Sequence, residues 1–191
     1  MSEKKQLWVL AGGNGVGKST FYHQYLSKYG IKFVNADLIA RSMDTYNPER
    51  LSYEAATLAS EIRDNMIAQG ESFCYETVFS HESKIDFIAM AKALRYSVIL
   101  VYIHLTDPSL NEARVYQRTL EGGHGVAGEK IRSRIPRTMK NIKIALPLVD
   151  EAWILDNSSG QNSFQQIAII KNGNCEKKVN PFPGWVMELL P

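Results

Sequence analysis

Short apolar runs alternate along this chain with longer stretches in which apolar residues recur at helical spacing. The runs predict strands at residues 7–11, 32–36, 73–78, 98–105 and 152–155. The longer stretches predict helices at about 18–29, 48–69, 83–95, 108–120 and 129–146, the last interrupted or restarted at Pro136. Regular alternation of strands and helices predicts an α/β fold of the P-loop NTPase type, with a parallel sheet and helices on both of its faces.

The segment after Asn157 follows a different pattern. Residues 164–171 and 176–179 predict two more strands, and Asn172, Gly173 and Asn174 between them favour a hairpin turn. We therefore expect a small C-terminal β-hairpin appendage over residues 158–191, packed on the domain that residues 1–157 form.

A glycine-rich segment joins the first predicted strand to the first predicted helix. Residues 12–19 read Gly-Gly-Asn-Gly-Val-Gly-Lys-Ser and match the G-x-x-x-x-G-K-[ST] pattern. Glycines let backbone N–H groups turn toward phosphate oxygens, and the helix that follows adds its positive N-terminal end. Lys18 would reach the β- and γ-phosphates, and the Ser19 hydroxyl would hold Mg²⁺. The residues predicted to bind ATP are Gly12, Gly13, Asn14, Gly15, Val16, Gly17, Lys18, Ser19 and Thr20.

Composition and charge narrow the classes of protein. Of 191 residues 45% are hydrophobic and 22% are charged, which allows a sizeable core and does not indicate disorder. A formal net charge of +2 without a polybasic block argues against a nucleic-acid or membrane partner. Two cysteines without a disulfide framework, and a core strand so close to Met1 that a signal peptide is not expected, predict a cytoplasmic protein.

Further features separate the classes of P-loop protein. The chain lacks the Asn-Lys-x-Asp motif with which GTPases read guanine. A stand-alone AAA-type ATPase would carry paired acids directly after a strand, whereas residues 106–108 read Thr-Asp-Pro. Small size and an arginine-rich segment after the fourth strand favour a kinase with a lid at about 114–137. We therefore predict a P-loop kinase domain over residues 1–157.

Polar residues follow the second and third strands, at the edge where open α/β sheets bind ligands. Asp37 is a candidate general base for an acceptor hydroxyl or a ligand of Mg²⁺-bound water, and it also suits the N-cap of a helix. Glu76, followed by Thr77, suits Mg²⁺-bound water or substrate hydroxyls, and is equally an ordinary carboxylate at a strand end. Arg41 is either a contact for a substrate phosphate or a solvated helix residue.

Basic residues flank a glycine-rich break after the helix at 108–120. Arg114 and Arg118 are four residues apart and share a helical face. Arg132 and Arg134 are two residues apart and point to different faces of a helix. Basic faces are often only solvated, yet beside a triphosphate site one or two of these arginines are expected to contact phosphate. His124, between two glycines of the break, is either a turn residue or a substrate contact.

Taken together, these motifs resemble the zeta-toxin family of P-loop kinases over about residues 8–157. The motifs are the glycine loop, Asn35-Ala36-Asp37, Glu76-Thr77-Val78-Phe79-Ser80, Arg114-Val115-x-x-Arg118, Gly122-Gly123-His124-x-Val126, Ile131-Arg132-x-Arg134 and Asn141. The chain departs from the family pattern at Ala127, where proline is common, and at Ser133, which separates two arginines that are often adjacent.

The resemblance implies ATP- and Mg²⁺-dependent phosphorylation of a small-molecule hydroxyl, with UDP-N-acetylglucosamine as the family's acceptor and an antitoxin protein as partner. It implies that Lys18 and Ser19 handle ATP and Mg²⁺, and that Asp37 is the general base. Glu76 and Thr77 would contact substrate or metal, and the catalytic lid arginines would be Arg118, Arg132 and Arg134. Two alternatives stay open, namely a housekeeping small-molecule kinase on this fold and a nucleotide-dependent binding switch.

Overall fold

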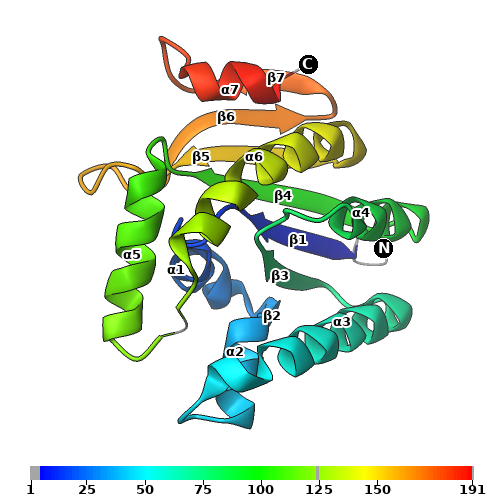
Figure 1. Ribbon diagram of the computed structural model, residues 1–191. Helices are drawn as coiled ribbons and strands as arrows, with labels where there is room; N and C mark the ends of the chain where they lie inside the picture. Colours follow the sequence, from blue (N-terminus) through cyan, green and yellow to red (C-terminus); the bar gives the residue numbers. More distant parts are fainter. Residues whose placement is uncertain (1–4, 124, 191) are drawn as a thin grey trace.

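The computed structural model describes residues 5–123 and 125–190, and it contains one seven-stranded sheet (Figure 1). The strands are β1 (Gln6–Ala11), β2 (Lys32–Val34), β3 (Phe73–Thr77), β4 (Ser97–His104), β5 (Glu151–Asp156), β6 (Gln165–Lys171) and β7 (Asn174–Lys177). Their order is β2-β3-β1-β4-β5-β6-β7, and the first five are parallel. The predicted P-loop NTPase fold with a mainly parallel sheet is therefore confirmed.

Helices connect the parallel strands, as the alternating pattern predicts. They are α1 (Lys18–Phe21), α2 (Ala36–Met43), α3 (Ser52–Gln69), α4 (Ser83–Ala93), α5 (Pro108–Leu120), α6 (Gly128–Ala145) and α7 (Gly184–Leu189). Helix α1 continues through a π-helical turn and a 3₁₀ turn until Gly30, whose φ of 69° ends it. Helix α6 runs through Pro136 without the predicted interruption. Helix α7 has no counterpart in the sequence prediction, and α2 was anticipated only by the alternative interpretations of Asp37 as an N-cap and of Arg41 as a helix residue.

Central strands bury side chains on both faces of the sheet. In β1, Leu7 and Val9 pack on one face while Leu10 packs on the other. The first face is covered by α3, α4, α6 and α7, and the second by α1 with the start of α5. Burial on both faces explains why β4 reads as an almost continuous apolar run. The sheet is thereby held rigid under the loops at its carboxyl edge.

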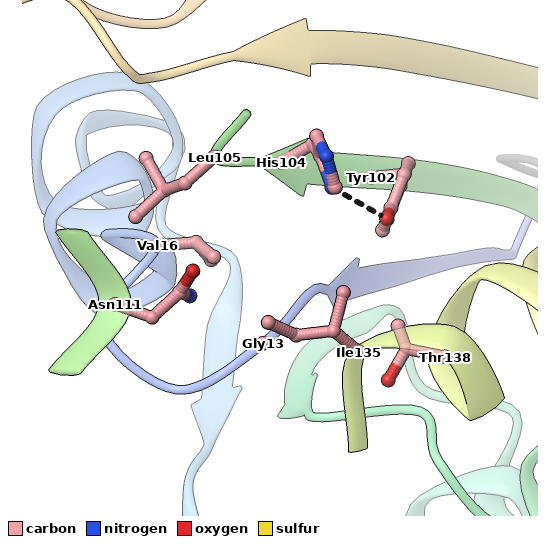
Figure 2. Close-up of a pocket in the computed structure, with 8 residues that line it drawn as sticks. All are labelled: Gly13, Val16, Tyr102, His104, Leu105, Asn111, Ile135 and Thr138. Carbon is pink, nitrogen blue, oxygen red and sulfur yellow. Dashed lines mark hydrogen bonds between the residues drawn. The ribbon is translucent and has the colours of Figure 1, made fainter. Parts of the chain in front are cut away.

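The C-terminal hairpin extends the sheet instead of packing on a face. Strand β6 pairs antiparallel with β5, and β7 pairs antiparallel with β6 and forms the edge opposite β2 (Figure 1). Helix α7 then returns across the sheet and places the Trp185 ring 4.2 Å from the His104 ring. The OH of Tyr102 lies 3.0 Å from Nδ1 of the same histidine (Figure 2). His104 is consequently buried at the end of β4.

We expect the free energy of unfolding to fall as the pH is lowered from about 6.5 to about 4, partly through His104. Burial lowers the pKa of His104 to about 4, although the negative charge of Asp156 acts in the opposite direction. An unfolded histidine titrates near pH 6.5, so the unfolded chain binds more protons across this interval. Stability present above pH 6.5 is then lost toward pH 4, by up to about 3 kcal/mol.

Urea unfolding of the wild type and of His104→Gln over this pH interval measures the effect. The variant should lose stability with a shallower slope, because glutamine does not titrate. Parallel curves for the two proteins would assign the pH dependence to carboxylates instead.

Candidate functional site

The glycine loop leaves β1 at the carboxyl edge of the sheet and enters α1. Gly15 and Gly17 have φ values of 78° and 95°, which favour glycine. A Cβ on Gly15 would lie 2.6 Å from the carbonyl oxygen of Asn111, and a Cβ on Gly17 would lie 2.9 Å from Nδ2 of Asn157. Any other residue at these two positions would therefore both strain the backbone and collide with a neighbour.

Two buried asparagines from distant elements brace this loop. Asn111 of α5 donates from Nδ2 to the carbonyl of Asn14 at 2.7 Å. Asn157, directly after β5, donates from Nδ2 to the carbonyl of Val16 at 2.9 Å. The backbone carbonyl of Asn157 accepts from Nη2 of Arg114 at 2.9 Å. The loop is thus held in shape from α5 and β5, and Arg114 is fixed by the same bracing.

Lys18, Ser19, Asn35 and Glu76 meet in one polar cluster at the start of α1. The Ser19 hydroxyl donates to Oε2 of Glu76 at 2.6 Å, and Nδ2 of Asn35 donates to the same oxygen at 2.7 Å. Nζ of Lys18 donates to the carbonyls of Gly12 and Gly13, both at 3.0 Å, and lies 3.6 Å from Oε1 of Glu76. Burial lowers the pKa of Lys18, while the nearby carboxylates of Glu76 and Asp37 oppose that shift.

Asp37 lies in the first turn of α2 and faces the cleft. The N-cap of this helix is Asn35, whose Oδ1 accepts from the backbone N–H groups of Asp37 and Leu38 at 2.8 and 3.1 Å. The interpretation of Asp37 as an N-cap is therefore wrong, and its carboxylate is not used by the helix backbone. Nη1 of Arg118 lies 3.8 Å from Oδ2 of Asp37, so one of the predicted lid arginines faces this carboxylate.

The three predicted lid arginines and Arg114 separate into two groups. Arg114, Arg118 and Arg134 line the same cleft as the glycine loop. Arg134 comes close to the loop itself, because its Nη1 donates to Oδ1 of Asn14 at 3.2 Å. Arg132 points elsewhere on α6 and forms a two-bonded ion pair with Glu112 of α5. Helical spacing predicted this divergence of Arg132 and Arg134.

The loop between α5 and α6 reaches across to the segment before α3. The backbone N–H of Gly125 donates to Oε1 of Glu49 at 2.8 Å, linking positions 76 residues apart. This contact bridges the predicted lid and the side of the cleft that α2 and α3 form. His124, the other candidate in this loop, lies outside the described residues.

A cleft of about 1150 Å³ connects these groups. Its lining includes Asn14, Gly15, Gly17, Lys18, Ser19, Thr20, Asp37, Glu76, Thr77, Arg114, Arg118 and Arg134. Gly13 and Val16 instead line a cavity of about 10 Å³ behind the loop, beside Asn111 and Ile135 (Figure 2). Arg41 lines a separate hollow of about 20 Å³ next to Asp37. Gly12 is buried against the carbonyl of Ile103 and lines none of these three spaces.

Several residues of this site were given no role from the sequence. Asn35, Asn111 and Asn157 order the cluster or the loop, and Arg63 and Lys84 also line the cleft. Asn35 carries a readable signal, since an asparagine three residues before an apolar helical pattern is a common N-cap. The other four depend on contacts between elements that are remote in sequence.

The residues present fit a nucleoside triphosphate with Mg²⁺. The glycine loop is open toward the cleft, and the hydroxyl of Ser19 beside the carboxylate of Glu76 provides the oxygen donors that Mg²⁺ prefers. Within residues 5–123 and 125–190 there is no cluster of three or more His, Cys, Asp and Glu side chains able to hold a metal by themselves. No described helix has the length and apolar character needed to cross a membrane.

Comparison with known proteins places residues 7–138 in a family described as AAA domain. Membership of this family is compatible with the predicted P-loop kinase domain, and the Thr-Asp-Pro sequence at residues 106–108 does not decide that membership. An uncharacterized protein of Haemophilus influenzae is 30% identical over 139 residues, which cover 69% of this chain and 98% of that protein.

Two solved structures share the fold. AvrRxo1-ORF1, crystallised with AvrRxo1-ORF2, superimposes with a TM-score of 0.73 at 17% identity over 93% of this chain, and its complex was also solved with ATP. This chain spans 62% of the length of that one. PezAT, a chromosomal toxin–antitoxin system of Streptococcus pneumoniae, matches with a TM-score of 0.67 at 14% identity over 99% of this chain and 79% of that chain.

Proposed function

The chain belongs to the AAA domain family, and from that premise and the geometry of its cleft we propose that it is an ATP-dependent phosphotransferase acting on a small-molecule hydroxyl. The observation that carries the proposal is the presence in one cleft of a braced phosphate loop and a carboxylate that no helix cap uses. The loop supplies Lys18 and Ser19, and the carboxylate is Asp37, which faces Arg118. A binding switch would need the first of these features but not the second.

In the proposed reaction the acceptor oxygen forms a bond to the γ-phosphorus of ATP. The bond from that phosphorus to the oxygen bridging the β- and γ-phosphates breaks, and ADP leaves. Asp37 accepts the proton of the acceptor hydroxyl. Lys18 and the lid arginines stabilise the charge that spreads over the phosphoryl oxygens, because they line the part of the cleft next to the loop.

Ser19 and Glu76 would hold Mg²⁺, which when bound neutralises charge on the phosphate oxygens. Asn35 acts on this pair as a positioning residue. Its amide holds Oε2 of Glu76 at 2.7 Å while its carbonyl oxygen caps α2, so the orientation of Glu76 is coupled to the placement of Asp37. The side chain of Asn35 therefore positions both the Glu76 carboxylate and the proposed general base, Asp37.

Replacing Arg134 by alanine should lower kcat by about 10²-fold or more, the scale for losing one charge-stabilising donor. The reason is its contact with Asn14 of the loop, which places its guanidinium beside the phosphates. Arg132→Ala is the matched control, since Arg132 is paired with Glu112 and lies outside the cleft lining. Steady-state kinetics of the two variants tests the assignment. An equal loss of kcat in both would indicate that Arg132 takes part in catalysis as well.

We propose a nucleotide sugar as acceptor, with UDP-N-acetylglucosamine as the first candidate. The resemblance of the motifs to zeta toxins and the fold shared with PezAT support this choice. Incubation with ATP, Mg²⁺ and UDP-N-acetylglucosamine should give a product heavier by one phosphoryl group in mass spectrometry. No such product from a preparation that binds ATP would favour a housekeeping kinase with another hydroxyl acceptor.

An antitoxin protein is the proposed macromolecular partner. The solved relatives support it, since PezAT is a toxin–antitoxin system and AvrRxo1-ORF1 was crystallised with AvrRxo1-ORF2. Expression of the chain alone and together with the product of its neighbouring gene tests the idea. Growth arrest relieved by co-expression is the expected result, and unaffected growth in both cases would contradict a toxin role.

A further inference from the structure

A second set of cations lines the cleft away from the glycine loop. Arg63 of α3 is only 9% exposed, and its Nη2 donates to the hydroxyl of Ser60 at 3.1 Å. Its Nε is buried and has no hydrogen-bond partner among residues 5–123 and 125–190. Among the residues that the structure describes, no carboxylate forms an ion pair with Arg63. A buried charge in this state is costly unless a ligand compensates it.

Aromatic rings hold the Arg63 guanidinium in place. Its Cζ lies 5.0 Å from the ring centre of Tyr75 in β3 and 5.3 Å from that of Phe87 in α4. Contacts of this kind stabilise a cation through the faces of the rings and do not use its N–H donors. The guanidinium is therefore positioned before any ligand arrives.

Lys84, in the first turn of α4, lines the same part of the cleft and is half-buried. Burial and the positive charge of Arg63 both lower the pKa of Lys84, and only Asp64 acts in the opposite direction. The two cations line the same cleft, and their like charges repel each other. An anion between them would remove this repulsion and pair both groups.

These cations share the cleft with Asp37 and the glycine loop. The lining includes residues of α3 and α4, Thr77 at the end of β3 and Val78 directly after it. Helix α3 packs against α2, which carries Asp37. A group bound at Arg63 and Lys84 would therefore belong to the molecule whose hydroxyl reaches Asp37.

We propose that Arg63 and Lys84 form an anion subsite that binds a phosphate or carboxylate group of the acceptor. The proposal rests on the proposed function and narrows its substrate class, because an uncharged alcohol or sugar would leave both cations unpaired. The diphosphate of a nucleotide sugar meets the requirement, as does a sugar acid. Arg114, Arg118 and Arg134, which line the same cleft, are assigned to ATP.

Calorimetric titration of the full chain, with the loop filled by a non-hydrolysable ATP analogue and Mg²⁺, tests the subsite. The probes are UDP-N-acetylglucosamine for phosphate, glucuronate for carboxylate and N-acetylglucosamine as the uncharged match. At least one anionic probe should bind, and more tightly than the uncharged one. Lys84→Gln and Arg63→Gln should each weaken it by about 10-fold or more, whereas Lys143→Gln, which removes an exposed charge on α6, should not.

Unchanged affinity in Lys84→Gln and Arg63→Gln would overturn the subsite, and so would equal binding of charged and uncharged probes or no binding of either anion. Lys84→Gln keeps the test valid if Arg63→Gln fails to fold, since Lys84 is not packed between the rings. Repeating the titration on Lys18→Ala without nucleotide reports the subsite independently of ATP. Failure of the ATP analogue to bind the wild type would contradict the proposed function. The titration of Lys18→Ala without nucleotide would still test the anion subsite in that case.

Discussion

Lys18→Ala should lower the rate of phosphotransfer by at least about 10²–10³-fold and weaken ATP binding, while the chain stays folded. The ammonium of Lys18 is the cation of the glycine loop, and its removal takes away a charge preorganised for the β- and γ-phosphates. The side chain faces the loop carbonyls and Glu76 rather than the apolar core. Turnover with ATP and thermal unfolding, measured on one preparation, separate the two effects.

Lys28→Ala is the matched control, because Lys28 is an exposed lysine in the 3₁₀ turn that continues α1. It removes the same charge at the far end of the same helical segment and should leave turnover unchanged. Wild-type turnover in a folded Lys18→Ala protein would end the ATP-phosphotransferase proposal. A variant that loses stability as well as activity would indicate that Lys18 mainly offsets the buried charge of Glu76.

Local pattern was sufficient to predict the parallel sheet and the glycine loop. Strand β4 is readable because a strand buried on both faces must be apolar throughout, and α5 is readable because Pro108 begins it and helical spacing continues to Leu120. The start of helix α2 was misplaced because the apolar run of β2 was extended to Ala36, although Asn35 leaves the strand to cap the helix. Helix α7 was missed because proline and glycine surround its start.

The candidate site was predicted where its residues are close to the loop in sequence or follow a strand. Lys18, Ser19, Asp37 and Glu76 belong to this group, and all four line the cleft. The bracing of the loop could not be predicted, because Asn157 contacts Val16 across 141 residues and an asparagine after a strand has no distinctive pattern. The same holds for residues on α3, since helical periodicity does not tell which polar position faces a cleft.

Asp37→Asn should lower kcat by about 10²–10⁴-fold and leave the affinity for ATP within a few-fold. Asparagine keeps the size of the side chain but cannot accept the acceptor proton. Because Asn35 and not Asp37 caps α2, the substitution should leave the free energy of unfolding nearly unchanged. Kinetics at saturating ATP, nucleotide titration and urea unfolding of the same protein provide the three measurements.

Asn35→Ala supplies the contrasting variant, because it removes the cap of α2 and a hydrogen bond to Glu76 while retaining the Asp37 carboxylate. It should destabilise the fold by about 1 kcal/mol and lower kcat less than Asp37→Asn does. The two variants therefore separate chemistry from positioning. If Asp37→Asn keeps wild-type kcat, the general base must be another group, and Glu76 is the nearest carboxylate to the loop that could take the role. The opposite pattern, a large loss of kcat with stability intact, would assign proton transfer to Asp37, whose carboxylate lies 3.8 Å from Arg118.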